Sequence, residues 1–482
     1  MYYQSTRNRE IKASSTQAVL QGLAPDGGLY VTGALEGFPW KDVLFLPTLE
    51  MATRVLQFLL PDFRNMEELV HRAYTDKFET EDLTPVRVAG YDFVLELFRG
   101  PTSAFKDVAL SMLPQLITAA REQEGVTDKI LILTATSGDT GKAALEGFRD
   151  GPGTEIIVFY PDGGVSAVQR KQMVSQEGGN VCVCAVEGNF DDTQTGVKEI
   201  FAQGIEPGCG VRLSSANSIN IGRLAPQVVY YFTAYRQMIE LERIDFGTKV
   251  DFVVPTGNFG NILAGYIAKQ MGLPVGRLIC ASNCNDVLTE FLATGTYDRR
   301  RPFHRTISPS MDILVSSNLE RLLWYLCRDE EEVAGYMRDL KEKGYYTVSP
   351  QLLEKLHANF AWGCCSEEET KETICRVWRR DGYLLDTHTA VAWKVMKEHQ
   401  KPGDHMVVLS TASPYKFPTA VLSALGEFPD DDEYQCMYRV NEVSQIPIPH
   451  GLATLEKKPE LHRHCIPKEE MRNFVMERIG GK

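Results

Sequence analysis

The stretch "LELFRGPTSAFKD", residues 95–107, joins an apolar run to the start of a helix through a tight turn. Gly100 and Pro101 end the apolar run, and Phe105 directly precedes a single lysine, Lys106. At a helix N-terminus among apolar groups, both the helix dipole and desolvation disfavour the charged amine. A neutral amine can attack a carbonyl, so the stretch predicts a lysine that forms a Schiff base. The alternative is an ordinary surface lysine, which is the commoner use of this residue.

Length and composition limit the possible functions. The 482 residues exceed what one small core needs, which predicts two or three domains. A net charge of −13 argues against a nucleic-acid or anionic-membrane partner. No window approaches ~20 uncharged apolar residues, so we expect no membrane span and a cytoplasmic protein. Eleven cysteines without a C-x-x-C pair predict reduced thiols, and the histidines lack partners at metal-binding spacing, so we expect no metal site.

Short apolar runs alternate with longer stretches of helical periodicity from residue 95 onward. Each run ends in a turn rich in Gly, Ser, Thr, Asp or Asn, and apolar runs without alternation suit strands buried on both faces. The pattern predicts an α/β protein with a parallel sheet and ligands at the carboxyl ends of the strands. The six runs are 129–141, 155–164, 180–188, 250–261, 277–283 and 405–417.

The two ends of this pattern define the predicted domains. Residues 1–94 differ in character and are predicted to form an N-terminal domain, and residues 95–482 a catalytic region of two lobes. Within that region, residues 296–380 are charged and helical, which is typical of an insertion.

Two of the turns after strands could hold an anion. "TSGDTG" (136–141) offers backbone N–H groups and hydroxyls at a helix start, although a plain capped helix explains it equally well. "PTGNFGN" (255–261) contains Gly257 and Gly260, which would let the backbone approach a phosphate closely.

Two further segments carry candidate ligands. "SSANSINIGRLAPQ" (214–227) brackets a turn with Asn217 and Arg223, which could clamp a phosphate or carboxylate. "STASPYKF" (410–417) places Thr411 and Lys416 after the last predicted strand. Helix caps and a solvated arginine are the alternative interpretations of these residues.

Taken together and in this order, the motifs resemble those of threonine synthases. The similarity covers nearly the whole chain, from "STRN" (5–8) and "APDGGLY" (24–30) to "STASPYKF". It is most specific in "LELFRGPTSAFKD" and "NSINIGR" (217–223). The resemblance implies the parallel-sheet fold of the tryptophan synthase β type, with two lobes, an N-terminal domain and a helical insertion.

The resemblance also implies pyridoxal 5'-phosphate as cofactor and a role for each matched residue. Lys106 would hold the cofactor covalently, and the glycine-rich loop would cradle its phosphate. The residues matched to the cofactor are Lys106, Asp139, Gly257, Asn258, Phe259, Gly260, Asn261 and Thr411. The residues matched to the substrate are Thr136, Ser137, Thr140, Asn217, Arg223 and Lys416. Asp139 departs from many relatives of the wider fold, which carry Asn beside the cofactor's phenolic oxygen.

The implied activity is the last step of threonine biosynthesis, in which O-phospho-L-homoserine and water give L-threonine and phosphate. Lys106 would be both the anchor and the base of this γ-elimination and β-addition. A similar phospho-lyase, which would release 2-oxobutyrate and ammonia, is the nearest alternative. A homologue that binds a ligand without catalysis is the alternative from another class. The resemblance leaves a monomer and a homodimer open.

Overall fold

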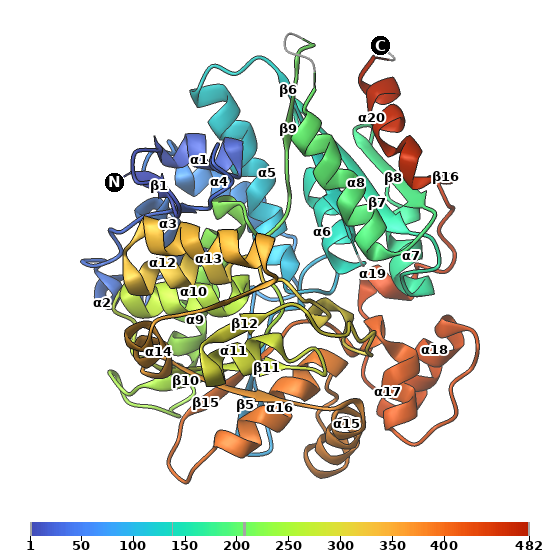
Figure 1. Cartoon of the computed structure of the whole chain (residues 1–482). Coiled ribbons are helices and arrows are strands. Elements are labelled where there is room, and N and C mark those ends of the chain that lie inside the picture. Colours follow the sequence, from blue (N-terminus) through green and yellow to red (C-terminus); the bar gives the residue numbers. More distant parts are fainter. Residues whose placement is uncertain (1, 137, 206–208, 481–482) are drawn as a thin grey trace.

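The computed structural model describes residues 2–136, 138–205 and 209–480. Two large sheets of mainly parallel strands form its two lobes, and helices cover each sheet (Figure 1). The larger has the strand order β14-β11-β10-β15-β5-β4, in which only the edge pair β4–β5 is antiparallel among the described strands. Its strands are β4 (Val86–Ala89), β5 (Asp92–Glu96), β10 (Val250–Pro255), β11 (Val275–Ser282), β14 (Phe360–Cys364) and β15 (Met406–Ser410).

The smaller sheet has the order β16-β8-β7-β6-β9 and is parallel throughout its described pairs. Its strands are β6 (Lys129–Ala135), β7 (Thr154–Pro161), β8 (Val181–Val186), β9 (Val211–Ser214) and β16 (His464–Ile466). All six runs predicted as strands are strands here, because each is apolar on both faces and is covered by helices on both. The predicted α/β parallel-sheet fold is therefore confirmed.

The N-terminal elements pack beside helix α5, on the far side from the smaller sheet (Figure 1). They are β1 (Tyr3–Ser5), β2 (Lys12–Ala13), β3 (Tyr30–Val31), α1 (Ser15–Gln21), α2 (Trp40–Val43), α3 (Thr48–Leu59) and α4 (Met66–Tyr74). Their apolar side chains belong to the same core as those of the two lobes. The predicted domain boundary at residue 94 falls inside β5. A division into separate domains stays a prediction.

Helices α5 and α9 form the centre of the molecule, and α9 is buried along almost its whole length. The helices of the two lobes are α5 (Lys106–Gln123), α6 (Asp139–Phe148), α7 (Ala167–Val174), α8 (Phe190–Gln203), α9 (Ile221–Glu240), α10 (Gly260–Gln270), α11 (Val287–Thr294) and α16 (Thr387–His399). The C-terminal ones are α17 (Pro418–Ala424), α18 (Glu433–Ser444), α19 (His450–Ala453) and α20 (Met471–Gly480), with the 3-10 turns η2 (Pro414–Lys416) and η3 (Lys468–Glu470).

The predicted insertion, residues 296–380, is helical but not wholly so. It contains η1 (Pro309–Met311), α12 (Leu319–Cys327), α13 (Glu330–Glu342), α14 (Pro350–His357), α15 (Glu367–Asp381) and the antiparallel pair β12 (Thr296–Asp298) and β13 (Tyr345–Thr347). It also contributes β14, which pairs in parallel with β11 in the larger sheet. The segment is thus part of the lobe rather than an addition to its surface.

Two further observations concern the surface and the thiols. No helix within the described ranges is long and apolar enough to cross a membrane. None of the eleven cysteines forms a disulfide in the described part of the chain.

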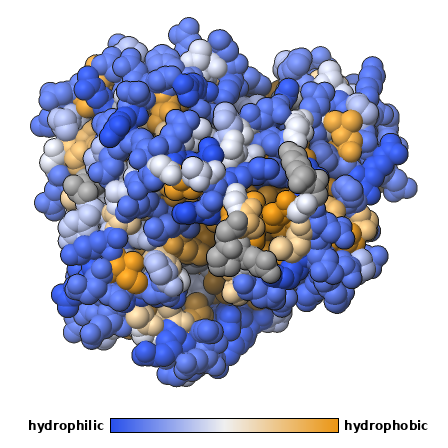
Figure 2. Space-filling view, turned by 90° about the horizontal axis from the view of Figure 1, so that it is seen from above, coloured by the Kyte–Doolittle hydropathy of each residue, from blue (hydrophilic) through white to orange (hydrophobic). Residues whose placement is uncertain are grey.

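Viewed from above, a predominantly hydrophilic surface is hollowed near its middle, and hydrophobic residues gather in the hollow (Figure 2).

Candidate active site

The turn before Lys106 is held by the residue that follows the lysine. Asp107 accepts hydrogen bonds from the backbone N–H of Thr102 at 2.9 Å and from its hydroxyl at 2.5 Å. A Cβ on Gly100 would lie 2.5 Å from the Cβ of Asp107, so glycine is required at this close approach. The N–H of Phe105 donates to the carbonyl of Thr411 at 2.8 Å. The turn is therefore fixed against the end of β15, and α5 begins at Lys106.

Lys106 lies in a buried, charged environment. Its side chain passes over the ring of Phe105, with Nζ 4.9 Å from the centroid, and Nζ lies 3.8 Å from Oδ2 of Asp139. Burial lowers the pKa of Lys106 to about 8, with Asp139 opposing the shift and Lys416 and Arg223 adding to it. A lysine with this pKa is partly neutral near pH 7, as a nucleophile and a base require.

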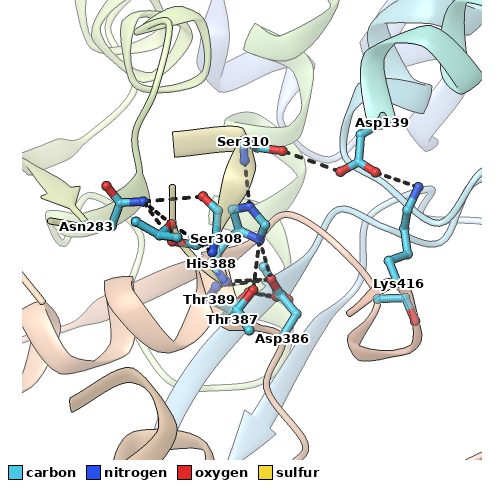
Figure 3. Close-up of polar contacts among 12 residues, drawn as sticks. Asp139, Asn283, Ser308, Ser310, Asp386, Thr387, His388, Thr389 and Lys416 are labelled. Atoms are coloured by element: carbon cyan, nitrogen blue, oxygen red, sulfur yellow. Dashed lines mark hydrogen bonds and ion pairs between the residues drawn. The ribbon is translucent and has the colours of Figure 1, made fainter. Parts of the chain in front are cut away.

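Asp139 and Lys416 form a buried ion pair beside Lys106. Nζ of Lys416 lies 2.7 Å from Oδ1 of Asp139 (Figure 3). It also donates to the carbonyl of Thr102 at 3.1 Å. Gln169 donates to the same carboxylate at 3.0 Å. Burial opposes ionisation, yet Lys416 and Lys106 hold the pKa of Asp139 well below its usual range. Asp139 is therefore a fixed negative charge within reach of the lysine amine.

The "TSGDTG" loop joins β6 to α6 beside this pair. The hydroxyl of Thr136 accepts from the N–H groups of Gly138 at 3.0 Å and Gly141 at 2.9 Å, which closes the loop. Thr140 is half-buried in the first turn of α6. Ser137 lies outside the described residues. The hydroxyl of Thr136 therefore caps the first turn of α6, as the alternative interpretation expects. The same loop also places Asp139 beside Lys106.

The "PTGNFGN" loop joins β10 to α10. Phe259 is buried with a positive φ of 63°, and a Cβ on Gly257 would lie 2.6 Å from the carbonyl oxygen of Ser310. At Gly260 the protein leaves room, because an added Cβ would meet no atom closer than 3.5 Å. The carbonyl of Asn258 accepts from Nδ2 of Asn318 at 3.0 Å. The first N–H groups of α10 have no acceptor within their own helix and could bind an anion here.

Two buried donors near this helix start have no acceptor among the described residues. They are Nδ2 of Asn261 and Nε of Arg223. The hydroxyl of Tyr230 donates to Oδ1 of Asn261 at 2.6 Å, and Tyr230 also opposes the fall in the pKa of Arg223, which burial lowers to about 10. Nη1 of Arg223 donates to the carbonyl of Ala216, but no carboxylate pairs with this guanidinium among the described residues, and it is only 3% exposed. A buried cation without an anionic partner is expensive, so a bound anion would stabilise it. The donor set therefore fits a phosphorylated ligand.

The remaining predicted residues lie at the edges of this centre. Asn217 is half-buried in the turn before α9, and its N–H donates to Oγ of Ser215 at 3.1 Å. Thr411 is buried directly after β15, where its carbonyl meets the lysine loop. The structure thus brings loops from both sheets to Lys106, as expected at the carboxyl ends of parallel strands.

A cavity of about 340 Å³ opens beside this centre. Residues from both lobes line it, including Gln169, Pro309 and Lys416, and the exposed Arg305 lies on its wall. This volume suits a small metabolite rather than a macromolecule.

Sequence reasoning missed three residues of this centre, namely Ser310, Asp386 and His388. Ser310 lies in η1, where the chain was predicted to be an insertion, and the pair Asp386–His388 lies at the start of α16. In the sequence, "DTHT" (386–389) is indistinguishable from an ordinary helix N-cap. The second role of this segment depends on contacts with residues far away in the chain. Nε2 of His388, for example, accepts a hydrogen bond at 3.1 Å from the N–H of Ser310, which lies 78 residues earlier.

Comparison with family models defines the class of protein. Residues 88–357 match the family described as "Pyridoxal-phosphate dependent enzyme". Residues 2–84 match "Threonine synthase N terminus" and residues 389–475 match "Threonine synthase, C-terminal". The fold, the buried lysine and these matches define a pyridoxal-phosphate-dependent enzyme.

Individual relatives narrow the class. The chain is 40% identical to threonine synthase of Pseudomonas aeruginosa, over 92% of this chain and 97% of that one. It is also 40% identical to threonine synthase-like 1 of Homo sapiens, over 94% of this chain but only 62% of that protein's length. The chain belongs to the threonine synthase family.

Solved structures agree with this assignment. The crystal structure of pyridoxal-phosphate-bound threonine synthase from Brucella melitensis matches with a TM-score of 0.87 at 39% identity, covering 99% of this chain and 98% of that one. Threonine synthase from yeast matches with a TM-score of 0.88 at 34% identity, covering 100% and 99%. Pyridoxal 5'-phosphate, the predicted cofactor, is the cofactor of this family.

Proposed function

We propose that the chain is a threonine synthase, which converts O-phospho-L-homoserine and water to L-threonine and phosphate. The observation that carries the proposal is one buried lysine, Lys106, whose amine lies 3.8 Å from the carboxylate of Asp139 and whose pKa is lowered to about 8 by burial. The bacterial and yeast relatives named threonine synthase support the synthase over the phospho-lyase.

The cofactor, when bound, supplies a conjugated ring that delocalises the negative charge left when a proton is removed from the substrate. We assign its anchoring to Lys106 and its phosphate to the first turn of α10, with Gly257, Asn258, Phe259, Gly260 and Asn261. Thr411 would face the pyridine nitrogen, and Asp139 would fix the electrostatic field around the lysine. The assignment of the cofactor phosphate is supported by the space at Gly260 and by Nδ2 of Asn261, which has no acceptor among the described residues.

The substrate residues are assigned as the resemblance implies, including Ser137, which lies outside the described residues. Thr136, Ser137 and Thr140 are assigned to the substrate carboxylate, and Asn217 and Arg223 to its phosphate. Lys106 would take the proton from Cα, a proton would also leave Cβ as phosphate leaves Cγ, and a proton would be returned at Cγ before water adds at Cβ. Lys416, first predicted to bind substrate phosphate, has Asp139 as its nearest partner, and we assign it chiefly to that carboxylate.

Cellular context completes the proposal. Eleven cysteines without a disulfide in the described part of the chain support a reducing compartment, and we propose the cytoplasm.

A product assay tests the function. The protein reconstituted with pyridoxal 5'-phosphate should release phosphate and L-threonine from O-phospho-L-homoserine in equal amounts. Formation of 2-oxobutyrate in place of threonine would identify the phospho-lyase, and no phosphate release would exclude both.

Gly260→Val should weaken cofactor binding by about tenfold or more, equivalent to roughly 1.4 kcal/mol. The protein itself tolerates a Cβ there, so the loss would report an obstructed ligand rather than an unfolded loop. Titration of the apoprotein with pyridoxal 5'-phosphate, followed by absorbance, measures the effect. Thr140→Val is the matched control and should leave cofactor affinity intact while weakening the substrate by about 1–3 kcal/mol. The opposite pattern would exchange the two roles.

Arg223→Lys should raise the KM for O-phospho-L-homoserine by about tenfold or more, because a point charge cannot replace a two-pronged hold on phosphate. Steady-state kinetics and a cofactor titration measure the two affinities separately. Arg236→Lys is a suitable control, since Arg236 lies on the same helix but pairs with Asp82 at 2.7 Å. A loss of cofactor affinity at unchanged KM would move Arg223 to the cofactor phosphate.

A further inference from the structure

Ser310 contacts both Lys106 and its neighbouring carboxylate. Oγ of Ser310 lies 3.4 Å from Nζ of Lys106. It also lies 3.5 Å from Oδ2 of Asp139 (Figure 3). An ionised carboxylate only accepts hydrogen bonds, so the hydroxyl proton points to Asp139 and the lone pairs face the amine. Both contacts are long, as hydrogen bonds in catalytic sites are before substrate binds.

The backbone of Ser310 is held by a buried histidine and aspartate. The N–H of Ser310 donates to Nε2 of His388 at 3.1 Å. This acceptor role leaves the proton on Nδ1, which lies 3.1 Å from Oδ1 of Asp386 (Figure 3). Asp386 also accepts the N–H of His388 at 2.8 Å, and both side chains are almost completely buried. The pair therefore fixes one histidine tautomer and, through it, the position of Ser310.

The segment around Ser310 is fixed from two other directions. Nδ2 of Asn283, after β11, donates to Oγ of Ser308 at 2.9 Å and to Oδ1 of Asp312 at 2.8 Å. On the other side, the carbonyl oxygen of Ser310 lies 2.6 Å from the position that a Cβ on Gly257 would take. Ser310 thus joins the lysine, the carboxylate and the cofactor loop at one point.

We propose that Ser310 is a further catalytic residue, whose hydroxyl accepts a hydrogen bond from Nζ of Lys106 and fixes the direction in which the amine exchanges protons. Asp386 and His388 are positioning residues that act through the backbone of Ser310. The proposal deepens the function assigned above, because it rests on Lys106 as the base.

Charged groups from four elements also face Lys106, and any effect of Ser310 on its titration adds to theirs. They are Asp139 on α6, Lys416 on η2, Arg223 on α9 and Asp107 on α5. Ser310→Ala removes a hydrogen-bond acceptor of the Lys106 ammonium but leaves these charges in place. The substitution therefore disfavours the protonated form of the amine. The titration of Lys106 should then move to lower pH.

Ser310→Ala, Ser310→Thr and the control Ser175→Ala test the proposal. Ser310→Ala should lower kcat about tenfold to a hundredfold with KM changed less than about threefold, the size expected for a lost hydrogen bond to a charged group. Ser310→Thr keeps a hydroxyl and should restore most of kcat. Ser175→Ala, which removes a buried hydroxyl at the end of α7 that donates to the carbonyl of Lys171 at 2.6 Å, should behave as the parent protein. Equal losses in the Ser310→Ala and Ser175→Ala variants would overturn the proposal.

The second readout uses the apoprotein and no substrate. The rate at which Lys106 reacts with trinitrobenzenesulfonate, followed on its peptide by mass spectrometry, gives the titration of the amine. We expect a shift to lower pH in Ser310→Ala and none in Ser175→Ala, and an unshifted titration in Ser310→Ala would contradict the contact. If the parent protein formed no threonine, the proposed function would fail while this measurement still decided the role of Ser310.

His388→Phe tests the positioning pair. Phenylalanine keeps the packing against Phe417, whose ring centroid lies 4.9 Å away, but removes the acceptor of the Ser310 N–H. We expect a fall in kcat in the same direction, and no further fall when it is combined with Ser310→Ala. Additive losses would show that His388 acts separately from Ser310.

Discussion

Lys106→Ala is expected to lower threonine formation by at least about 10²–10⁴-fold, the usual contribution of one positioned general base. The loss should exceed that of any other single change, because the same amine anchors the cofactor and moves the protons. The visible absorption band of lysine-bound cofactor should be absent from the variant. Product assays and absorbance spectra of the reconstituted protein measure both effects.

Lys269→Ala is the matched control for this prediction. Lys269 is also a helix lysine, partly buried, but its Nζ donates to the carbonyl of Gly276 at 2.7 Å, at the opposite end of α10 from the site. It should keep the cofactor band and the activity. Retention of more than about a tenth of the activity by Lys106→Ala would contradict the assignment of the base.

The pH dependence of cofactor attachment follows from the lowered pKa of Lys106. Only the neutral amine attacks the cofactor aldehyde, so the attachment rate to apoprotein should rise with pH and level off above about 8. A lysine at its ordinary value of 10.5 would continue to gain rate beyond that point. Stopped-flow absorbance on apoprotein between these two values separates the cases.

The strands and the lysine turn could be predicted because their causes are local. Uninterrupted apolar runs specify strands buried on both faces, and Gly100 with Asp107 specifies the turn within eight residues. β14 was hidden, because its run, "FAWGC" (360–364), is short and lies among charged helices. Only its pairing with β11 makes it a strand.

The polar partners in the site could not be predicted for a different reason. Lys416 pairs with Asp139, and Ser310 with Lys106, across chain separations that no periodicity encodes. A lysine in "PYKF" is, as a pattern, equally a surface residue or a phosphate ligand. Burial distinguishes these uses, and burial is a property of the fold.

Lys416→Met is expected to lower the free energy of unfolding by about 3–5 kcal/mol, the usual effect of breaking a buried ion pair. Lys416 is 0% exposed. Without it, the carboxylate of Asp139 has only one cation close to it among the described residues, the amine of Lys106 at 3.8 Å. Urea unfolding of the apoprotein at pH 7 measures the loss. Lys129→Met is the control, because its pair with Glu155 is more exposed and should be worth only about 0–1 kcal/mol.

The charge origin of this loss gives two further expectations. Combining Lys416→Met with Asp139→Asn should recover part of the stability, because no uncompensated carboxylate remains. In the parent protein the depressed pKa of Asp139 contributes stability above the ordinary value of 3.8, which is lost as the pH falls through the folded pKa. The Lys416→Met variant lacks most of that contribution. The difference in the free energy of unfolding between the parent protein and this variant should therefore shrink as the pH falls. A raised KM at unchanged stability would instead return Lys416 to the substrate phosphate.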